Sequence, residues 1–222
     1  MKPRSALDND LLKLNDNLTK LASLTEEALA VATASLEKFD IISARRVVVG
    51  DEEINHLRSM IEKDCLRVLA RQMPQATDLR QVLAIYSIAG ELERIGDHAS
   101  GISRLVLRIA EEGKEPAETL YQLPKMSRRA QKMVHEGIAA YLNQDVALAK
   151  KVIARDNKLD RQYGKFSRIM FDSMNQTDIN EEITVPTYLL WMAHNIERIG
   201  DRVTNICERV IFFVTGEHFE GD

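Results

Sequence analysis

The sequence predicts an all-α fold, a tandem duplication of a three-helix bundle with six long helices. Glycine and proline are scarce, with 10 and 5 in 222 residues, so the chain has few turn residues and favours long helices. Apolar residues recur every three or four positions, as they do along one face of an amphipathic helix. The pentapeptide ERIGD occurs at residues 93–97 and again at residues 197–201, which indicates an internal repeat.

Three helices are expected in the first half of the chain. The first covers residues 7–39, where leucine and alanine form one apolar stripe. The second covers residues 45–73 and ends at Pro74, because proline cannot continue a helix. The third covers residues 77–112, and the hydroxyl of Thr77 is expected to cap its first turn.

Three further helices are expected after a break at residues 113–118, which contain glycine and proline. The fourth helix begins near Pro124, because proline is tolerated in a first turn. The fifth covers residues 145–174 and is followed by a polar loop at 175–182. The sixth begins near Thr184.

The apolar stripe of the sixth helix repeats that of the third at the same offset of 104 residues as the pentapeptide. A period of this length is a whole domain rather than one unit of a solenoid. We therefore expect two repeats, residues 1–113 and residues 114–222.

Composition and charge narrow the functional classes. The net charge of −4 provides no basic surface of the kind that binds nucleic acid. The polar N-terminus has no apolar segment of a signal peptide, and no apolar run reaches the ~18 residues of a membrane span. We expect a cytoplasmic protein in which Cys65 and Cys207 are buried thiols.

The repeated pentapeptide places two carboxylates on one helix face, four residues apart. Like charges at this spacing destabilise a helix by roughly 0.2–0.5 kcal/mol. Gly96 and Gly200, inside the same segments, each cost a further ~0.5–1 kcal/mol relative to alanine. Because both costs occur twice, some gain should offset them.

The preceding helix of each half supplies oxygen atoms at the same height. In an antiparallel pair, residues equidistant from the turn face each other, and the turns lie at Pro74 and in the 175–182 loop. The expected facing pairs are Asp51 with Asp97, Asn55 with Glu93, Asp156 with Asp201, and Asp160 with Glu197.

Converging carboxylates repel one another and suit a multivalent cation such as iron, manganese, magnesium or calcium. The alternative is that Arg94, Arg198 and other basic residues neutralise these acids at a solvated surface. The residues alone leave both interpretations open.

Four segments of the chain resemble the PhoU family of bacterial phosphate-signalling proteins. They are ELERIGDHASGI (91–102), NIERIGDRVTNICERVIFFVTGE (195–217), DEEINHLRSMIEKDCLRVLARQMPQATDLR (51–80) and RDNKLDRQYGKFSRIMFDSM (155–174). The similarity spans nearly the whole chain in the family's order of two bundles.

The resemblance implies divalent or trivalent metal ions, such as iron, zinc or manganese, bound through repeated acidic pairs. The family motif, Glu/Asp-x-x-x-Asp, falls on Glu93 with Asp97, Asp156 with Asp160, and Glu197 with Asp201. Its fourth copy falls on Asp51 with Asn55, where asparagine departs from the pattern.

The resemblance also implies a function. Proteins of this family are cytoplasmic negative regulators of the phosphate-starvation response that restrain phosphate uptake. They couple the ATPase subunit of a phosphate ABC transporter to a phosphate-sensing histidine kinase, and they reach the membrane only through such partners. They are homodimers or higher oligomers and are not enzymes.

Two rival functions are a metal-free helical scaffold and a ferritin-like di-iron oxidase. The oxidase needs two Glu-x-x-His motifs, and the chain has one, at Glu53 and His56, where we expect a surface histidine.

The sequence also predicts where two aromatic residues and two arginine pairs lie. Tyr188 and Trp191 are expected in the core. Two arginine pairs, at residues 45–46 and 128–129, are read either as solvated surface or as a contact for an acidic partner.

Overall fold

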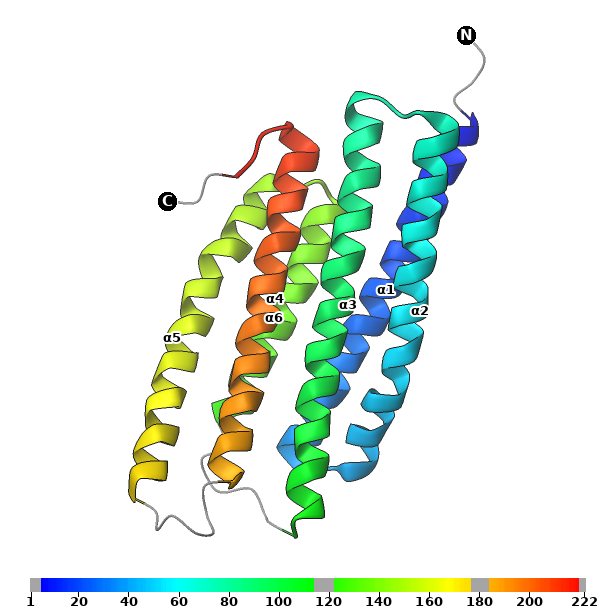
Figure 1. The fold of residues 1–222 in the computed structure, drawn as a ribbon. Helices are drawn as coiled ribbons and strands as arrows, with labels where there is room; N and C mark the ends of the chain where they lie inside the picture. Colours follow the sequence, from blue (N-terminus) through cyan, green and yellow to red (C-terminus); the bar gives the residue numbers. More distant parts are fainter. Residues whose placement is uncertain (1–4, 114–121, 177–183, 220–222) are drawn as a thin grey trace.

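The computed structural model describes residues 5–113, 122–176 and 184–219. All regular secondary structure in these residues is helical, which confirms the predicted all-α fold (Figure 1). The six helices are α1 (Ser5–Lys38), α2 (Ile41–Gln72), α3 (Ala76–Glu111), α4 (Gln122–Leu142), α5 (Val146–Gln176) and α6 (Thr184–Thr215).

Each half is a three-helix bundle, and the two bundles lie side by side. Helices α3 and α6 run antiparallel through the middle of the molecule, with α5 at one side and α1 and α2 at the other (Figure 1). The halves join where α3 packs against α6 and where α1 packs against α4. Within the halves, α2 packs on α1 and α3, and α5 packs on α4 and α6.

The apolar stripes form one continuous core that relates the halves. Buried positions of α1 recur in α4 at an offset of 105 residues: Leu18 corresponds to Leu123, and Leu29 corresponds to Val134. The offset is 105 for α2 and α5 as well, and 104 for α3 and α6. Burial of such side chains contributes ~1.5–3 kcal/mol each, so this core supplies most of the driving force for the fold.

The start of α2 differs from the prediction. The helix begins four residues before Arg45, because the Asp40 carboxylate accepts hydrogen bonds from the backbone N–H groups of Ile42 and Ser43. An Asp at this position satisfies free donors of the first turn. The sequence reasoning missed this cap.

The predicted cap of α3 is wrong. The N-cap position is Gln75, whose backbone carbonyl accepts a hydrogen bond from the N–H of Asp78. Thr77 lies inside the first turn, where its hydroxyl accepts a hydrogen bond from Arg80. Helix α5 has a side-chain cap, since Asp145 accepts from the N–H of Leu148 at 2.9 Å. The other described ends of α1, α2, α3 and α5 lie within two residues of their predicted positions.

Two predicted connections fall largely outside the described residues. These are the break at 113–118, beyond Gly113, and the 175–182 loop, beyond residue 176. The domain limits 1–113 and 114–222 therefore stay predictions.

Several side chains were predicted correctly and one was not. Cys65 and Cys207 are buried free thiols, and His56 is exposed, as expected. Tyr188 is partly buried against the core, but Trp191 is 49% exposed. The apolar run from 188 to 193 does not define one helix face, and the core takes Leu189, Met192 and Ala193 instead.

None of the helices in the described part of the chain combines the length and the apolar character needed to cross a membrane.

Candidate metal centre

Acidic side chains gather at two equivalent places, one in each half. We name the group between α2 and α3 the first acidic cluster and the group between α5 and α6 the second acidic cluster. The first consists of Asp51, Glu93 and Asp97 with Asn55 beside them, and the second consists of Asp156, Asp160, Glu197 and Asp201.

The second acidic cluster shows strong mutual repulsion. Burial and, after it, the charges of Asp160, Asp201 and Glu197 together raise the pKa of Asp156 from 3.8 to about 7. Burial and the charge of Asp201 also raise the pKa of Asp160 and of Glu197. Asp156 on α5 is therefore within electrostatic range of Asp160 and of Glu197 and Asp201 on α6.

Two oxygens of the second acidic cluster lack hydrogen bonds. Asp156 Oδ1 and Glu197 Oε2 are buried and accept no hydrogen bond from any described residue. Leaving a buried acceptor unpaired costs ~1–3 kcal/mol. Asp156 and Glu197 would be among the residues that hold a cation, whose positive charge would offset this cost.

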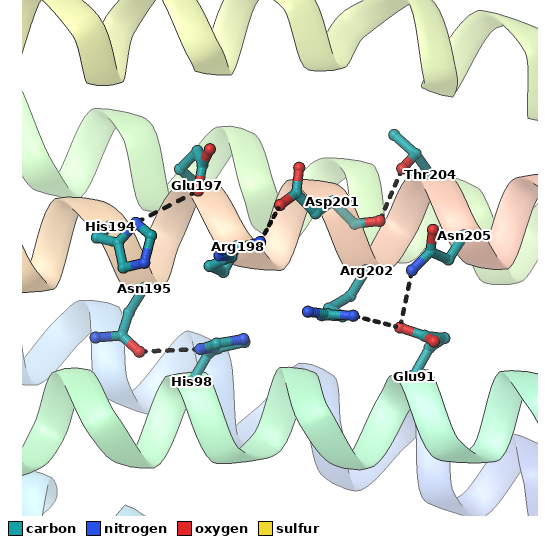
Figure 2. Close-up of polar contacts among 10 residues, drawn as sticks. All are labelled: Glu91, His98, His194, Asn195, Glu197, Arg198, Asp201, Arg202, Thr204 and Asn205. Carbon is teal, nitrogen blue, oxygen red and sulfur yellow. Dashed lines mark hydrogen bonds and ion pairs between the residues drawn. The ribbon is translucent and has the colours of Figure 1, made fainter. Parts of the chain in front are cut away.

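Basic neighbours neutralise the second acidic cluster in part. Arg198 Nη1 lies 3.2 Å from Asp201 Oδ2, and His194 Nδ1 lies 3.7 Å from Glu197 Oε2 (Figure 2). Figure 2 also shows Glu197 and Asp201 projecting from α6 away from α3. The predicted alternative of surface ion pairs is thus present at Arg198 and His194, while Asp156 Oδ1 and Glu197 Oε2 still accept no hydrogen bond from the described residues.

The mid-helix glycines allow the close approach of carboxylates. A Cβ atom on Gly200 would overlap Asp156 Oδ1 and would lie 2.7 Å from Leu159 Cδ2. A Cβ atom on Gly96 would lie 3.1 Å from Ile54 Cδ1 and 3.7 Å from Asp51 Oδ1. Both glycines therefore let the preceding helix place its aspartate against the backbone of the next, which is the gain that offsets their helix-breaking tendency.

The first acidic cluster is weaker. Asp51 is 8% exposed, and burial and the charge of Asp97 raise its pKa, while Arg104 lowers it. Arg104 Nη2 lies 3.9 Å from Asp51 Oδ2, and Asp51 Oδ1 accepts no hydrogen bond from the described residues. Burial and Asp97 also raise the pKa of Glu93, and the side chain of Asn55 is exposed.

The donor chemistry of the clusters fits a multivalent cation, since carboxylate oxygens are the ligands that hard cations prefer. The unpaired buried oxygens of Asp51, Asp156 and Glu197 point to the same fit. Within the described residues, however, no three His, Cys, Asp or Glu side chains stand close enough together to hold an ion. Side-chain rotations would be needed to close a ligand set.

A polar network that the sequence reasoning missed joins the halves between α3 and α6. Buried Glu91 contacts Arg202 Nη1 at 3.6 Å and accepts a hydrogen bond from Asn205 Nδ2 at 3.3 Å (Figure 2). It also accepts a hydrogen bond from Arg94 Nη1 at 3.1 Å. Arg94 therefore bonds to Glu91, and no described ion pair joins it to the first acidic cluster.

A second contact of this network is the equivalent of the first. His98 Nδ1 lies 2.9 Å from Asn195 Oδ1 (Figure 2). At the offset of 104, Glu91 corresponds to Asn195 and His98 to Arg202, so the two contacts are related by the internal repeat. The sequence contained a sign of this network, because polar residues flank both copies of the repeated pentapeptide at these positions.

The predicted oxidase motif lies away from the clusters' facing sides. Glu53 and His56 are exposed on α2, and Glu53 Oε1 lies 3.9 Å from Lys20 Nζ. This contact is an ordinary surface ion pair, which contributes ~0–1 kcal/mol.

Known protein sequences show the same division into two halves. The family model described as "PhoU domain" matches twice, at residues 18–106 and 123–210. The Phosphate-specific transport system accessory protein PhoU of Serratia marcescens is 33% identical over 218 residues, covering 96% of this chain and 87% of the relative. A PhoU homolog of the same description from Streptococcus pneumoniae is 32% identical and covers 96% and 97% of the two chains.

Two solved structures of PhoU proteins have the same fold as this chain. The crystal structure of PhoU from Pseudomonas aeruginosa superimposes with a TM-score of 0.90 at 32% identity and covers 95% of this chain and 99% of that one. The phosphate transport system regulatory protein PhoU from Streptococcus pneumoniae gives 0.87 at 31% identity, with 96% and 99% covered.

Proposed function

Because the chain belongs to the PhoU family, we propose that it is a regulatory accessory protein of phosphate-specific transport. The observation that carries this proposal is the doubled PhoU domain together with relatives of nearly equal length named as accessory proteins of that system. In this role the protein acts through binding, without catalysing a reaction of its own.

The finer proposal follows the family resemblance. The protein works in the cytoplasm as a homodimer or larger assembly. It contacts the ATPase subunit of a phosphate ABC transporter and a phosphate-sensing histidine kinase. When phosphate is abundant, it favours the inhibited state of the kinase and restrains uptake.

The acidic clusters would contribute to this role by binding metal ions such as iron, zinc or manganese. A bound cation would supply positive charge that cancels the repulsion among the carboxylates. In the second half the holding residues would be Asp156, Asp160, Glu197 and Asp201; in the first, Asp51, Glu93 and Asp97 with the carbonyl of Asn55. The carboxylates would then fix α2 against α3 and α5 against α6, which supports a rigid surface for partners.

The regulatory role is tested in a strain that lacks the gene for this protein and carries a phosphate-starvation reporter. We expect high reporter expression in abundant phosphate and repression when the wild-type gene is returned. Unchanged expression on deletion would overturn the proposal.

Metal binding is tested separately by elemental mass spectrometry of protein purified without chelator. We expect metal in the wild type and its loss in a Glu197→Ala, Asp201→Ala variant, while a variant of the exposed Asp172 on α5 keeps it. No metal in any of them would favour the metal-free scaffold.

A further inference from the structure

A groove opens between α1 and α2 of the first half. It has a volume of about 220 Å³, and Val31, Val47 and Ile54 are among its lining residues. Gly50 lies at its edge, and a Cβ atom there would meet nothing within 4 Å. We name it the α1–α2 groove.

An apolar hollow adjoins the α1–α2 groove at the start of α2. It has a volume of about 450 Å³ and shares Arg46 and Gly50 with the groove. Two of its lining residues, Ile42 and Val49, are 77% and 71% exposed. Contiguous exposed apolar side chains are a common feature of protein interaction sites.

The second half serves as an internal control for this surface. At the offset of 105, Val31 corresponds to Glu136 and Gly50 corresponds to Arg155. Glu136 and Arg155 form an ion pair between α4 and α5. The position that is open in the first half is thus occupied by a polar bridge in the second, although both halves have the same helix arrangement.

The exposed apolar residues of the hollow are also replaced in the second half. Ile42 and Val49 correspond to alanines at 147 and 154, whereas Arg45 and Arg46 correspond to lysines at 150 and 151. The basic pair is thus common to both halves, whereas at the positions of Ile42 and Val49 only the first half has large apolar side chains.

The charge of the surface indicates what covers it. Arg45 and Arg46 are exposed, and neither forms an ion pair with any described residue. The other predicted arginine pair is engaged: Arg128 pairs with Glu37, and Arg129 donates to Gln162 at 2.6 Å. Two unpaired guanidinium groups beside exposed apolar side chains are complementary to a segment with carboxylates next to an apolar anchor.

Two glutamates also line the α1–α2 groove and would orient such a segment. Glu27 and Glu53 are lining residues there, and Lys20 lies 3.9 Å from Glu53. The acidic side of a bound segment would therefore lie toward Arg45 and Arg46, away from these glutamates.

We propose that the α1–α2 groove and the adjoining hollow bind an acidic, apolar-anchored segment of a partner protein. An apolar side chain of the segment enters beside Gly50, and its carboxylates pair with Arg45 and Arg46. Binding of an amphipathic helix in an apolar groove is a recurring mode of peptide recognition. The inference rests on the proposed regulatory function, which requires a binding surface for partners.

The test measures binding of two fluorescent helical peptides to the purified full chain by fluorescence anisotropy. One peptide carries a leucine stripe flanked by glutamates, and the other carries the same stripe flanked by lysines. We expect the acidic peptide to bind at least tenfold more tightly. The variant Val31→Glu, Gly50→Arg copies the polar bridge of the second half and should reduce this binding tenfold or more, because it fills the groove.

Two charge-reversal variants, one in each half, test the role of the basic pair. Arg45→Glu, Arg46→Glu should abolish binding of the acidic peptide, whereas Lys150→Glu, Lys151→Glu should leave it unchanged. Circular dichroism of each variant verifies that it is folded. Because the assay uses purified protein, its failure leaves the reporter test of the proposed function unaffected.

Three results would overturn the proposal. The first is equal binding of both peptides, or acidic-peptide binding that the groove-filling variant retains. The second is selective binding to vesicles of anionic phospholipid, with loss in the Arg45→Glu, Arg46→Glu variant and no peptide binding. The third is self-association of the chain that the groove-filling variant removes, which would make a second copy the occupant.

Discussion

Replacing Asp156 by asparagine should stabilise the metal-free protein above neutral pH. Burial and three neighbouring carboxylates raise the pKa of Asp156 in the folded protein from 3.8 to about 7. At full weight, that shift corresponds to ~4 kcal/mol at a pH above both values. Because the side chain is partly exposed, solvent screening reduces the effect, and we expect ~2 kcal/mol.

The sign follows from the direction of the shift. Below about pH 4 the carboxyl is protonated in both the folded and the unfolded chain, so it adds no penalty. As the pH rises from about 4 to about 7, the unfolded chain releases this proton while the folded chain retains it, and the folded state loses stability. Asparagine does not ionise, so the Asp156→Asn variant lacks this loss.

Urea unfolding followed by far-ultraviolet circular dichroism, with chelator present, measures the difference. We expect Asp156→Asn and wild type to unfold alike at about pH 4, and the variant to be ~2 kcal/mol more stable at about pH 8. Asp172→Asn, an exposed position on the same helix, should change stability by less than ~0.5 kcal/mol. A variant that is no more stable than wild type at about pH 8, or equally stabilised at both pH values, would refute the reasoning.

Three further predictions concern packing, the contact between the halves and the thiols. Gly200→Ala should lower the free energy of unfolding by ~1–3 kcal/mol because its Cβ would overlap side chains of α5, and Gly96→Ala should lower it less; equal losses would contradict this reading. Glu91→Ala should cost ~1–3 kcal/mol in urea unfolding, because basic and amide groups of α6 lose their acceptor, and an unchanged midpoint would count against the network. Burial raises the pKa of Cys65 and Cys207 to about 12, so an aromatic disulfide reagent should titrate no thiol in the native protein and both after unfolding; rapid native reaction would show that they are accessible.

Most of the helical architecture could be predicted because it depends on periodicity and on a repeat within one chain. Long apolar stripes and two exact copies of ERIGD establish six helices and two halves without any structural information. The cap of α2 was missed because Asp40 stands among apolar residues that also suit a strand or a turn. Trp191 was misplaced because the start of α6 is apolar on more than one face.

The acidic clusters could be predicted in part. Counting residues from the turns correctly brought Asp51 near Asp97 and Asp156 near Asp201, since antiparallel helices keep a fixed rise per residue. Counting did not show that Arg104 approaches the first cluster, because Arg104 lies two turns beyond Asp97 on α3 and reaches Asp51 through its long side chain. Nor could it show which arginines would find partners, because that depends on packing between the halves.

Comparison of the two halves separates what the duplicated architecture requires from what each half does individually. The glycine that admits an aspartate is present in both halves, as Gly96 and Gly200, so close helix approach belongs to the shared architecture. The positions that differ lie at contacts outside this approach, where Glu91 faces Arg202 while its equivalent Asn195 faces His98. A duplicated unit can thus keep its core while the polar contacts beside the core change from one copy to the other. The open groove at Gly50 also differs between the halves, because the Glu136–Arg155 ion pair fills the equivalent position. Its apolar lining residues are therefore available for the proposed contact with a partner.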